Sequence, residues 1–170
     1  NSLNANSAIV VTVSPKDYGT NPLDGLTFQR NLEEKAYILG NGKIPIQTIK
    51  DFHNSVESKK LGNISPVFKG DYQLTDLNQL FPSYITDSIK EALPNFDQKI
   101  LGFNDDNAIL AGVESRTSSP IRIPRDENLE SSIKGIYPCG EGAGYAGGIT
   151  TSAMDGLKVA ESIISTYQNL

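Results

Sequence analysis

The stretch from Gly135 to Tyr167 constrains the fold most, because it combines a short apolar segment, a glycine-rich turn and a long helical pattern. Residues 135–139 predict a strand, and apolar residues spaced three and four apart predict a helix after it. These apolar residues are Ile149, Ala153, Leu157, Ala160, Ile164 and Tyr167. A helix that starts at such a turn presents unpaired N–H groups and the positive end of its dipole, so the arrangement predicts a site for anionic oxygen.

Within the turn, the residues from Gly142 to Gly147 match the dinucleotide-binding pattern G-x-G-x-x-G. A complete unit of that type also needs a second strand with an acidic residue about 20 positions later, and the sequence has none. No Gly-Lys-Ser or Gly-Lys-Thr follows the glycines, which excludes a nucleoside triphosphate P-loop. A plain tight turn between strand and helix remains the alternative.

Composition excludes several classes of function. With 170 residues and 38% apolar content, the chain can bury one sizeable core or two small ones. A net charge of −5 without a basic cluster excludes nucleic acid as the main partner. Apolar runs of only a few residues predict no membrane span, and we expect a soluble, cytoplasmic protein. The single cysteine, Cys139, and the single histidine, His53, exclude an internal disulfide and a Cys/His metal set; we expect Cys139 to be buried at a strand end.

The amino-terminal half predicts a strand followed by two helices. Residues 7–13 are rich in β-branched side chains and end at a turn, which predicts a strand. Residues 26–39 have helical spacing, with Thr27 as a candidate N-cap and the sequence 40–42, Gly-Asn-Gly, as the end. Pro45 predicts the first residue of a second, short helix. The inward face of that helix would carry Ile46, Ile49 and Phe52.

The middle of the chain predicts short helices separated by prolines. Pro82 and Pro94 divide three apolar segments, residues 77–81, 85–93 and 96–100, each of which predicts a short helix. Such a cluster is typical of a cap or the wall of a substrate domain, and plain packing is the alternative for each apolar residue.

A loop and a further strand complete the pattern. Residues 55–72 are polar and without a period, which predicts a loop. Residues 108–114 predict a strand, placed beside residues 8–13 or in the same sheet as residues 136–139.

An arginine followed by hydroxyl side chains forms a second candidate site. Arg116, Thr117, Ser118 and Ser119 precede Pro120 and offer hydrogen-bond donors in one loop, suited to a carboxylate, a phosphate or the polar edge of a ring. The alternative is a hydroxyl-rich turn in which Arg116 makes a surface ion pair.

Three segments together, residues 112–123, 135–149 and 153–156, resemble the carboxyl end of the uncharacterised FAD-dependent dehydrogenases, also called NAD(FAD)-utilising dehydrogenases. Residues 4–8 and 28–33 are similar to the middle region of the same family, so the resemblance spans nearly the whole chain. Members of that family begin with a strand, a glycine-rich turn and a helix that hold the ADP half of FAD, and this sequence has no such unit. We therefore expect a carboxyl-terminal fragment that begins at Asn1 instead of methionine.

The resemblance implies an α+β fold with two regions. Residues 1–107 would form a substrate or cap region of strand and short helices, and residues 108–170 would form a partial, Rossmann-like part of the FAD-binding domain. The main partner would be the missing amino-terminal part of the same protein. The substrate would be an unidentified small molecule, with NAD(P)H among the candidates.

The resemblance also implies roles for individual residues. Glu141 would make a polar contact on the ribityl–pyrophosphate side of FAD. Close backbone approach would be permitted by Gly140 and Gly142, and N–H groups toward the flavin would come from Gly147, Gly148, Ile149 and Thr150. The flavin face or substrate pocket would be lined by Arg116, Thr117 and Ser118. No residue is identified as a catalytic acid or base.

Two functions of different classes follow. The first is a fragment of an FAD-dependent oxidoreductase that contributes the isoalloxazine half of the flavin site and that, alone, is inactive and prone to self-association. The second is a self-contained, non-enzymatic module whose glycine loop binds a phosphorylated ligand or only makes a turn.

Overall fold

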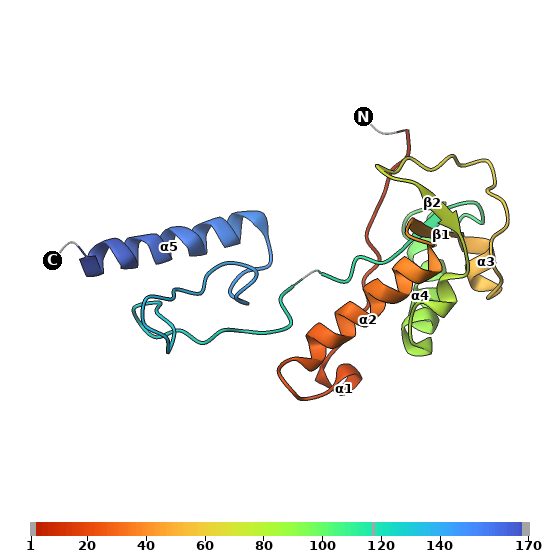
Figure 1. The fold of residues 1–170 in the computed structure, drawn as a ribbon. Coiled ribbons are helices and arrows are strands. Elements are labelled where there is room, and N and C mark those ends of the chain that lie inside the picture. The colour runs from red at the N-terminus through yellow and green to blue at the C-terminus, as the bar shows by residue number, and fades with distance from the viewer. Residues whose placement is uncertain (1–2, 117, 168–170) are drawn as a thin grey trace. The chain divides into compact units, whose positions relative to one another are not determined.

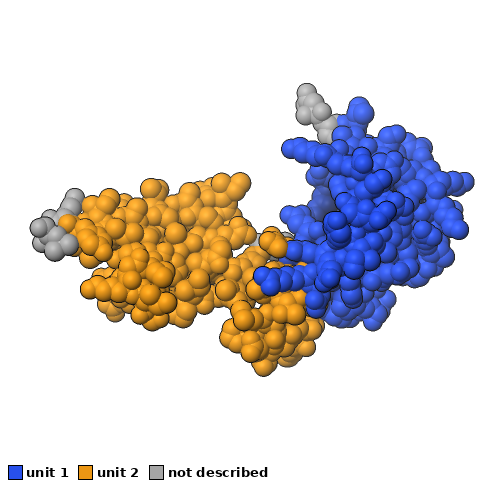
Figure 2. Space-filling model, viewed as in Figure 1, with its two compact units in different colours: residues 1–14, 30–115 blue, residues 15–29, 116–170 orange. Residues whose placement is uncertain are grey.

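The computed structural model describes residues 3–116 and 118–167 and confirms the α+β class (Figure 1). Its elements are α1 (Pro15–Tyr18), α2 (Asp24–Leu39), β1 (Ile44–Thr48), α3 (Ile49–His53), β2 (Tyr72–Leu74), the 3-10 helix η1 (Leu77–Gln79), α4 (Ser83–Asp97), β3 (Ile109–Ala111) and α5 (Ile149–Tyr167). The chain divides into two compact units, which Figure 2 shows in different colours. Unit 1 comprises residues 1–14 and 30–115, and unit 2 comprises residues 15–29 and 116–170. The division into functional regions after residue 107 stays a prediction.

The sheet of unit 1 has the strand order β2-β1-β3. The central strand β1 pairs in parallel with β2, with Ile46 opposite Leu74, and antiparallel with β3, with Ile46 opposite Ala111. The prediction of a helix from Pro45 is therefore wrong, because this segment is hydrogen-bonded to a strand on each side. Pro45 fits the central strand because its carbonyl accepts a hydrogen bond from Gly112 N at 3.2 Å and its missing N–H leaves the register intact.

Helix α3 begins directly after β1, four residues later than predicted. Thr48 is its N-cap, and its Oγ1 accepts a hydrogen bond from Asp51 N at 3.3 Å. The predicted burial is nonetheless confirmed, since Ile46, Ile49 and Phe52 are 0%, 3% and 1% exposed. The switch from strand to helix keeps all three apolar side chains in the core.

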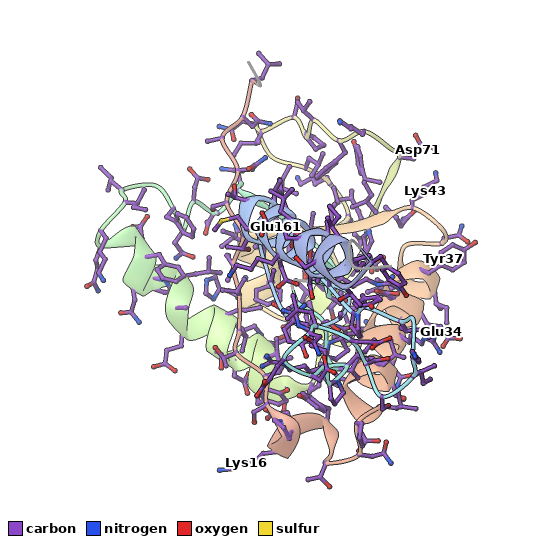
Figure 3. All side chains as sticks on the ribbon, turned by 90° about the vertical axis from the view of Figure 1, so that its left-hand side faces the viewer. Lys16, Glu34, Tyr37, Lys43, Asp71 and Glu161 are labelled. Carbon is purple, nitrogen blue, oxygen red and sulfur yellow. The ribbon has the colours of Figure 1, made fainter. Side chains whose placement is uncertain are left out.

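The core of unit 1 joins the sheet to α2, α3 and α4. Its buried members are Ala36, Ile49, Phe52, Leu77, Leu80 and Leu93. They come from elements spread along the chain, so the core brings together residues far apart in sequence. Away from this core, the surface carries polar groups: Figure 3 shows the side chains of Tyr37, Lys43 and Asp71 reaching outward.

A buried polar side chain ties the loop after α3 to the sheet. Gln47 on β1 is fully buried, and its Nε2 donates to the Val56 carbonyl at 2.7 Å. Its Oε1 accepts from Leu77 N at 2.8 Å. Nearby, Ser58 Oγ accepts from Thr48 N at 3.0 Å. The segment predicted as a loop, residues 55–72, is thus fixed at its start by hydrogen bonds, and β2 begins where it ends.

Two of the predicted helix boundaries differ in the structure. Helix α2 begins at Asp24, ahead of the candidate cap Thr27, whose Oγ1 instead donates to the Leu23 carbonyl at 3.2 Å. Its end is confirmed by the positive φ angles of Asn41 and Gly42. Helix α4 is one helix through Pro94 and not two, because a proline near the last turn costs few hydrogen bonds while Leu93 is fully buried.

Two predicted strands are not formed among the described residues. Residues 7–13 and 136–139 belong to no helix or paired strand, and Val10 and Ile136 are 75% and 49% exposed. The third, β3, pairs with β1 and with neither of these segments. Strand propensity alone does not create a strand, because the hydrogen bonds must come from a second chain segment.

Candidate functional site

The glycine-rich loop, defined here as residues 138–148, leads into α5 within unit 2. Helix α5 begins at Ile149, as the sequence predicts. The loop folds on itself through two backbone hydrogen bonds, from Gly144 N to the Glu141 carbonyl at 2.9 Å and from Tyr145 N to the Gly140 carbonyl at 3.0 Å. Gly140 and Gly144 have φ angles of +70° and +82°, which glycine adopts without strain.

Residues 119–123 lie against this loop. Ile123 N donates to the Ala143 carbonyl at 3.2 Å, and Tyr145 Oη donates to the Ile123 carbonyl at 2.9 Å. A Cβ on Gly144 would lie 2.5 Å from the Ile121 carbonyl oxygen. Only glycine fits there, so Gly144 is required by the packing of the protein itself.

An ion pair between Arg125, which follows residues 119–123, and Asp155 on α5 holds the start of the loop. Arg125 Nη2 and Nη1 donate to Asp155 Oδ1 and Oδ2 on α5 at 2.7 and 3.0 Å. Arg125 Nη1 also donates to the Pro138 carbonyl at 2.8 Å, and Asp155 Oδ2 accepts from Gly140 N at 2.9 Å. These hydrogen bonds, from Arg125 first and from Gly140 second, lower the pKa of Asp155 to about 2.

The ring of Tyr145 lies under two guanidinium groups. The Cζ atoms of Arg125 and Arg122 are 3.6 and 4.3 Å from the ring centroid, within the range of cation–π attraction. Arg125 therefore contacts the loop at its entry, through Pro138, and again at Tyr145.

The outward side of the loop is open. A Cβ on Gly142 would meet nothing within 4 Å, and those on Gly147 and Gly148 would make only ordinary contacts at 3.7 and 3.5 Å. None of the three has a positive φ angle. Packing among the described residues therefore does not require glycine at these three positions.

The start of α5 offers donors to such a group. Gly148 N donates to Thr151 Oγ1 at 3.1 Å, but for the N–H groups of Ile149 and Thr150 no acceptor is found in the described part of the chain. Ile149 is 94% exposed. Ser152 Oγ is buried beside the loop without a hydrogen-bond partner among the described residues. Free N–H groups, absent Cβ atoms and the positive end of the dipole fit an anionic or polar ring edge.

The apolar stripe of α5, defined as the six apolar residues that predict this helix, is exposed within unit 2. Ile149, Leu157, Ile164 and Tyr167 are 94%, 65%, 53% and 53% exposed, whereas Val159 on the other side is 5% exposed. The helix packs on its own unit through the face of Val159 and Asp155. The stripe forms as the spacing predicts, and the described residues leave most of it exposed.

The remaining predicted site residues have different positions. Ser118 lies against the loop, since its Oγ would be 3.7 Å from a Cβ on Gly147. Glu141 and Arg116 are exposed, and Thr117 lies outside the described residues. Cys139 is exposed and not buried, and the strand at whose end it was expected does not form.

Sequence reasoning missed the Arg125–Asp155 pair and Tyr145. The signal that could have indicated the pair is weak: Asp155 falls in the segment 153–156 that carries the family resemblance, but no spacing rule connects it to Arg125.

Unit 1 has a polar hollow of about 430 Å³, away from the glycine-rich loop, that Glu57 and Asp76 line. Hydrogen bonds from Asn78 hold Asp76, so its carboxylate already has partners.

No three His, Cys, Asp or Glu side chains gather as a metal site in residues 3–116 and 118–167. Across the same described residues, none of the helices has the length and apolar character to cross a membrane.

Comparison with known proteins supplies the family. Residues 1–117 match the model of the family described as FAD-dependent protein, C-terminal domain-like. The chain belongs to this family. An uncharacterised protein of Clostridium beijerinckii is 48% identical over 168 residues, which cover 96% of this chain and 32% of that protein. The chain thus spans about a third of the length of this relative, and the alignment extends through the glycine-rich loop, beyond the residues that the family model matches.

Proposed function

We propose that this chain is the carboxyl-terminal part of an FAD-dependent oxidoreductase, in which the glycine-rich loop and the start of α5 form the isoalloxazine-side half of the flavin site. Membership of an FAD-dependent family supports the cofactor. The observation that carries the placement is the open face of Gly142, Gly147 and Gly148 before a helix with free N–H groups. A Rossmann-like unit would then be completed by chain outside these residues.

The residues at this site are suited to distinct tasks. A bound FAD would supply a hydride acceptor. The N–H groups at Gly147, Gly148, Ile149 and Thr150 and the helix dipole would stabilise negative charge on a flavin ring held there. Gly140 and Gly142 let the backbone approach closely, and Glu141 supplies a polar contact. Arg116, Thr117 and Ser118 would orient the substrate, an unidentified small molecule with NAD(P)H among the candidates.

The apolar stripe of α5 supports a partner within the same protein. Ile149 and Leu157 are 94% and 65% exposed, an extent that isolated domains avoid along a whole helix face. Residues 136–139 are in no strand of the described structure. We infer that the other part of the full-length protein, about two thirds of the relative's length, covers the stripe and pairs with this segment. A cytoplasmic location stays a prediction.

The test is Gly148→Val in the full-length protein. The valine side chain would occupy the space in front of the helix start, so we expect FAD retention to be lost or greatly weakened while unit 1 stays folded. The flavin-to-protein ratio from absorbance after purification measures retention. Gly70→Val is the matched control, because a Cβ there meets only Ile44 Cδ1 at 3.8 Å. Undiminished flavin in the Gly148 variant would refute the placement of this loop.

A further inference from the structure

The Arg125–Asp155 pair joins three segments that meet at the proposed flavin site. Arg125 follows the segment that lies against the loop, Pro138 and Gly140 begin the loop, and Asp155 stands in the second turn of the helix that follows it. The side chains of the pair are 10% and 12% exposed. Bidentate geometry in a partly buried place makes this pair stronger than an ordinary surface ion pair.

The hydrogen bonds of the Asp155 carboxylate are made within the protein itself. Its Oδ1 accepts from Arg125, and its Oδ2 accepts from Arg125 and from Gly140 N. Three of the roughly four acceptor positions of the carboxylate are therefore used within unit 2. Its structural effect is to connect the entry of the glycine-rich loop to the helix at its exit.

The Arg125 guanidinium adds a second attachment. It lies 3.6 Å from the centroid of Tyr145, whose N–H is bonded to the Gly140 carbonyl and whose hydroxyl is bonded to the Ile123 carbonyl. One guanidinium thus restrains both the entry of the loop and its far side. Between these points lie Glu141 and Gly142, whose Cβ position is open, and just beyond Tyr145 lie Gly147 and Gly148.

We propose that Arg125 and Asp155 are positioning residues that hold the glycine-rich loop in the conformation that receives the flavin. This inference rests on the proposed function of the loop. Without the pair, the Pro138 carbonyl and Gly140 N–H lose their partners, and the loop samples other conformations. The apparent affinity for FAD is then the intrinsic affinity multiplied by the fraction of time that the loop spends in the receptive conformation.

The experiment uses the full-length protein, stripped of flavin, with the variants Arg125→Ala, Arg125→Lys and Asp155→Asn. Titration with FAD, followed by flavin fluorescence, gives Kd. Losing a charge-assisted hydrogen bond of this kind should raise Kd about ten- to a hundredfold for Arg125→Ala and Asp155→Asn. Lysine keeps the charge but not the bidentate fork, so Arg125→Lys should give an intermediate Kd.

Lys158→Ala is the matched control. Lys158 is exposed on the same helix and acts on Asp155 through its charge, with no hydrogen bond to it. The Lys158→Ala substitution removes the same unit charge as Arg125→Ala but no hydrogen bond to Asp155. The Kd of this variant for FAD should therefore stay within about twofold of the wild type.

Hydrogen exchange of the flavin-free protein provides a readout independent of the cofactor. We expect faster exchange in residues 138–148 for Arg125→Ala and Asp155→Asn, with exchange in unit 1 unchanged. Wild-type Kd and exchange in both variants would overturn the inference, as would an equal effect of Lys158→Ala. If the wild-type protein binds no FAD, the proposed function fails, while exchange in the loop still decides whether the pair positions it.

Discussion

Replacing Gln47 by leucine should destabilise unit 1, because Gln47 is a fully buried side chain whose polar atoms all serve the fold. Leucine keeps the approximate volume but removes the acceptor of Leu77 N and the donor to the Val56 carbonyl. Leu77 is 2% exposed, so its N–H cannot turn to water. The bond to the Val56 carbonyl is partly buried, and Gln47 Nε2 also donates to Asp76 Oδ1 at 3.3 Å.

The magnitude follows from these lost hydrogen bonds. One buried, unpaired N–H costs about 1–3 kcal/mol, and the lost bond to the partly buried Val56 carbonyl adds about 1 kcal/mol. The greater apolar surface of leucine offsets part of this cost. We therefore expect Gln47→Leu to lower the free energy of opening of unit 1 by about 2–3 kcal/mol.

Amide hydrogen exchange of unit 1, resolved by peptide mass spectrometry, suits this measurement because the chain has two units that need not open together. The control is Gln79→Leu, since Gln79 is exposed and its Nε2 lies 3.4 Å from Asp76 Oδ2. That change should stay within about 0.5 kcal/mol of the wild type. An opening free energy of Gln47→Leu equal to or above the wild-type value would refute the reasoning.

Four further predictions concern unit 2 and the cofactor. Gly144→Ala should lower the free energy of opening of the glycine-rich loop by about 2–4 kcal/mol, because a Cβ would meet the neighbouring backbone at 2.5 Å and the φ angle is +82°. Gly142→Ala should have little effect, and hydrogen exchange of the loop amides distinguishes the two variants. Hydrogen bonds from Arg125 and Gly140 lower the pKa of Asp155 from its ordinary value of 3.8 to about 2 in the folded protein. The stability that its pair with Arg125 contributes is therefore present above about pH 4 and is lost as pH falls toward 2. A titration followed by NMR of the carboxyl group measures this pKa, and a midpoint near 3.8 would contradict the prediction. In the full-length enzyme, Arg116→Ala should lower turnover or substrate affinity more than the melting temperature, and unchanged kinetics with a reduced melting temperature would favour a surface ion pair. Residues 1–170 alone should be colourless and bind added FAD weakly, because only one half-site is present; tight stoichiometric binding in a fluorescence titration would favour the self-contained module.

Local patterns predicted the elements whose signals lie within a few residues. Helix α5 begins at Ile149, where the apolar helical spacing starts after glycines that disfavour a helix, and α2 ends at the Gly-Asn-Gly turn, where positive φ angles occur. The 3-10 helix η1 falls in the segment 77–81 that predicted a helical turn. The burial of Ile49 and Phe52 followed from their apolar character, although the helix boundary was wrong.

Tertiary contacts decided the rest. The segment from Pro45 became the central strand because β2 and β3 supply hydrogen bonds on both sides, while residues 7–13, with stronger strand propensity, found no neighbour. Arg125 and Asp155 are 30 positions apart, and only the folded chain brings their complementary charges together. The sequence by itself determined which residues are apolar, where glycine permits a turn and where a helix starts; hydrogen-bond and ion partners depend on distant segments, so only the tertiary structure could assign them.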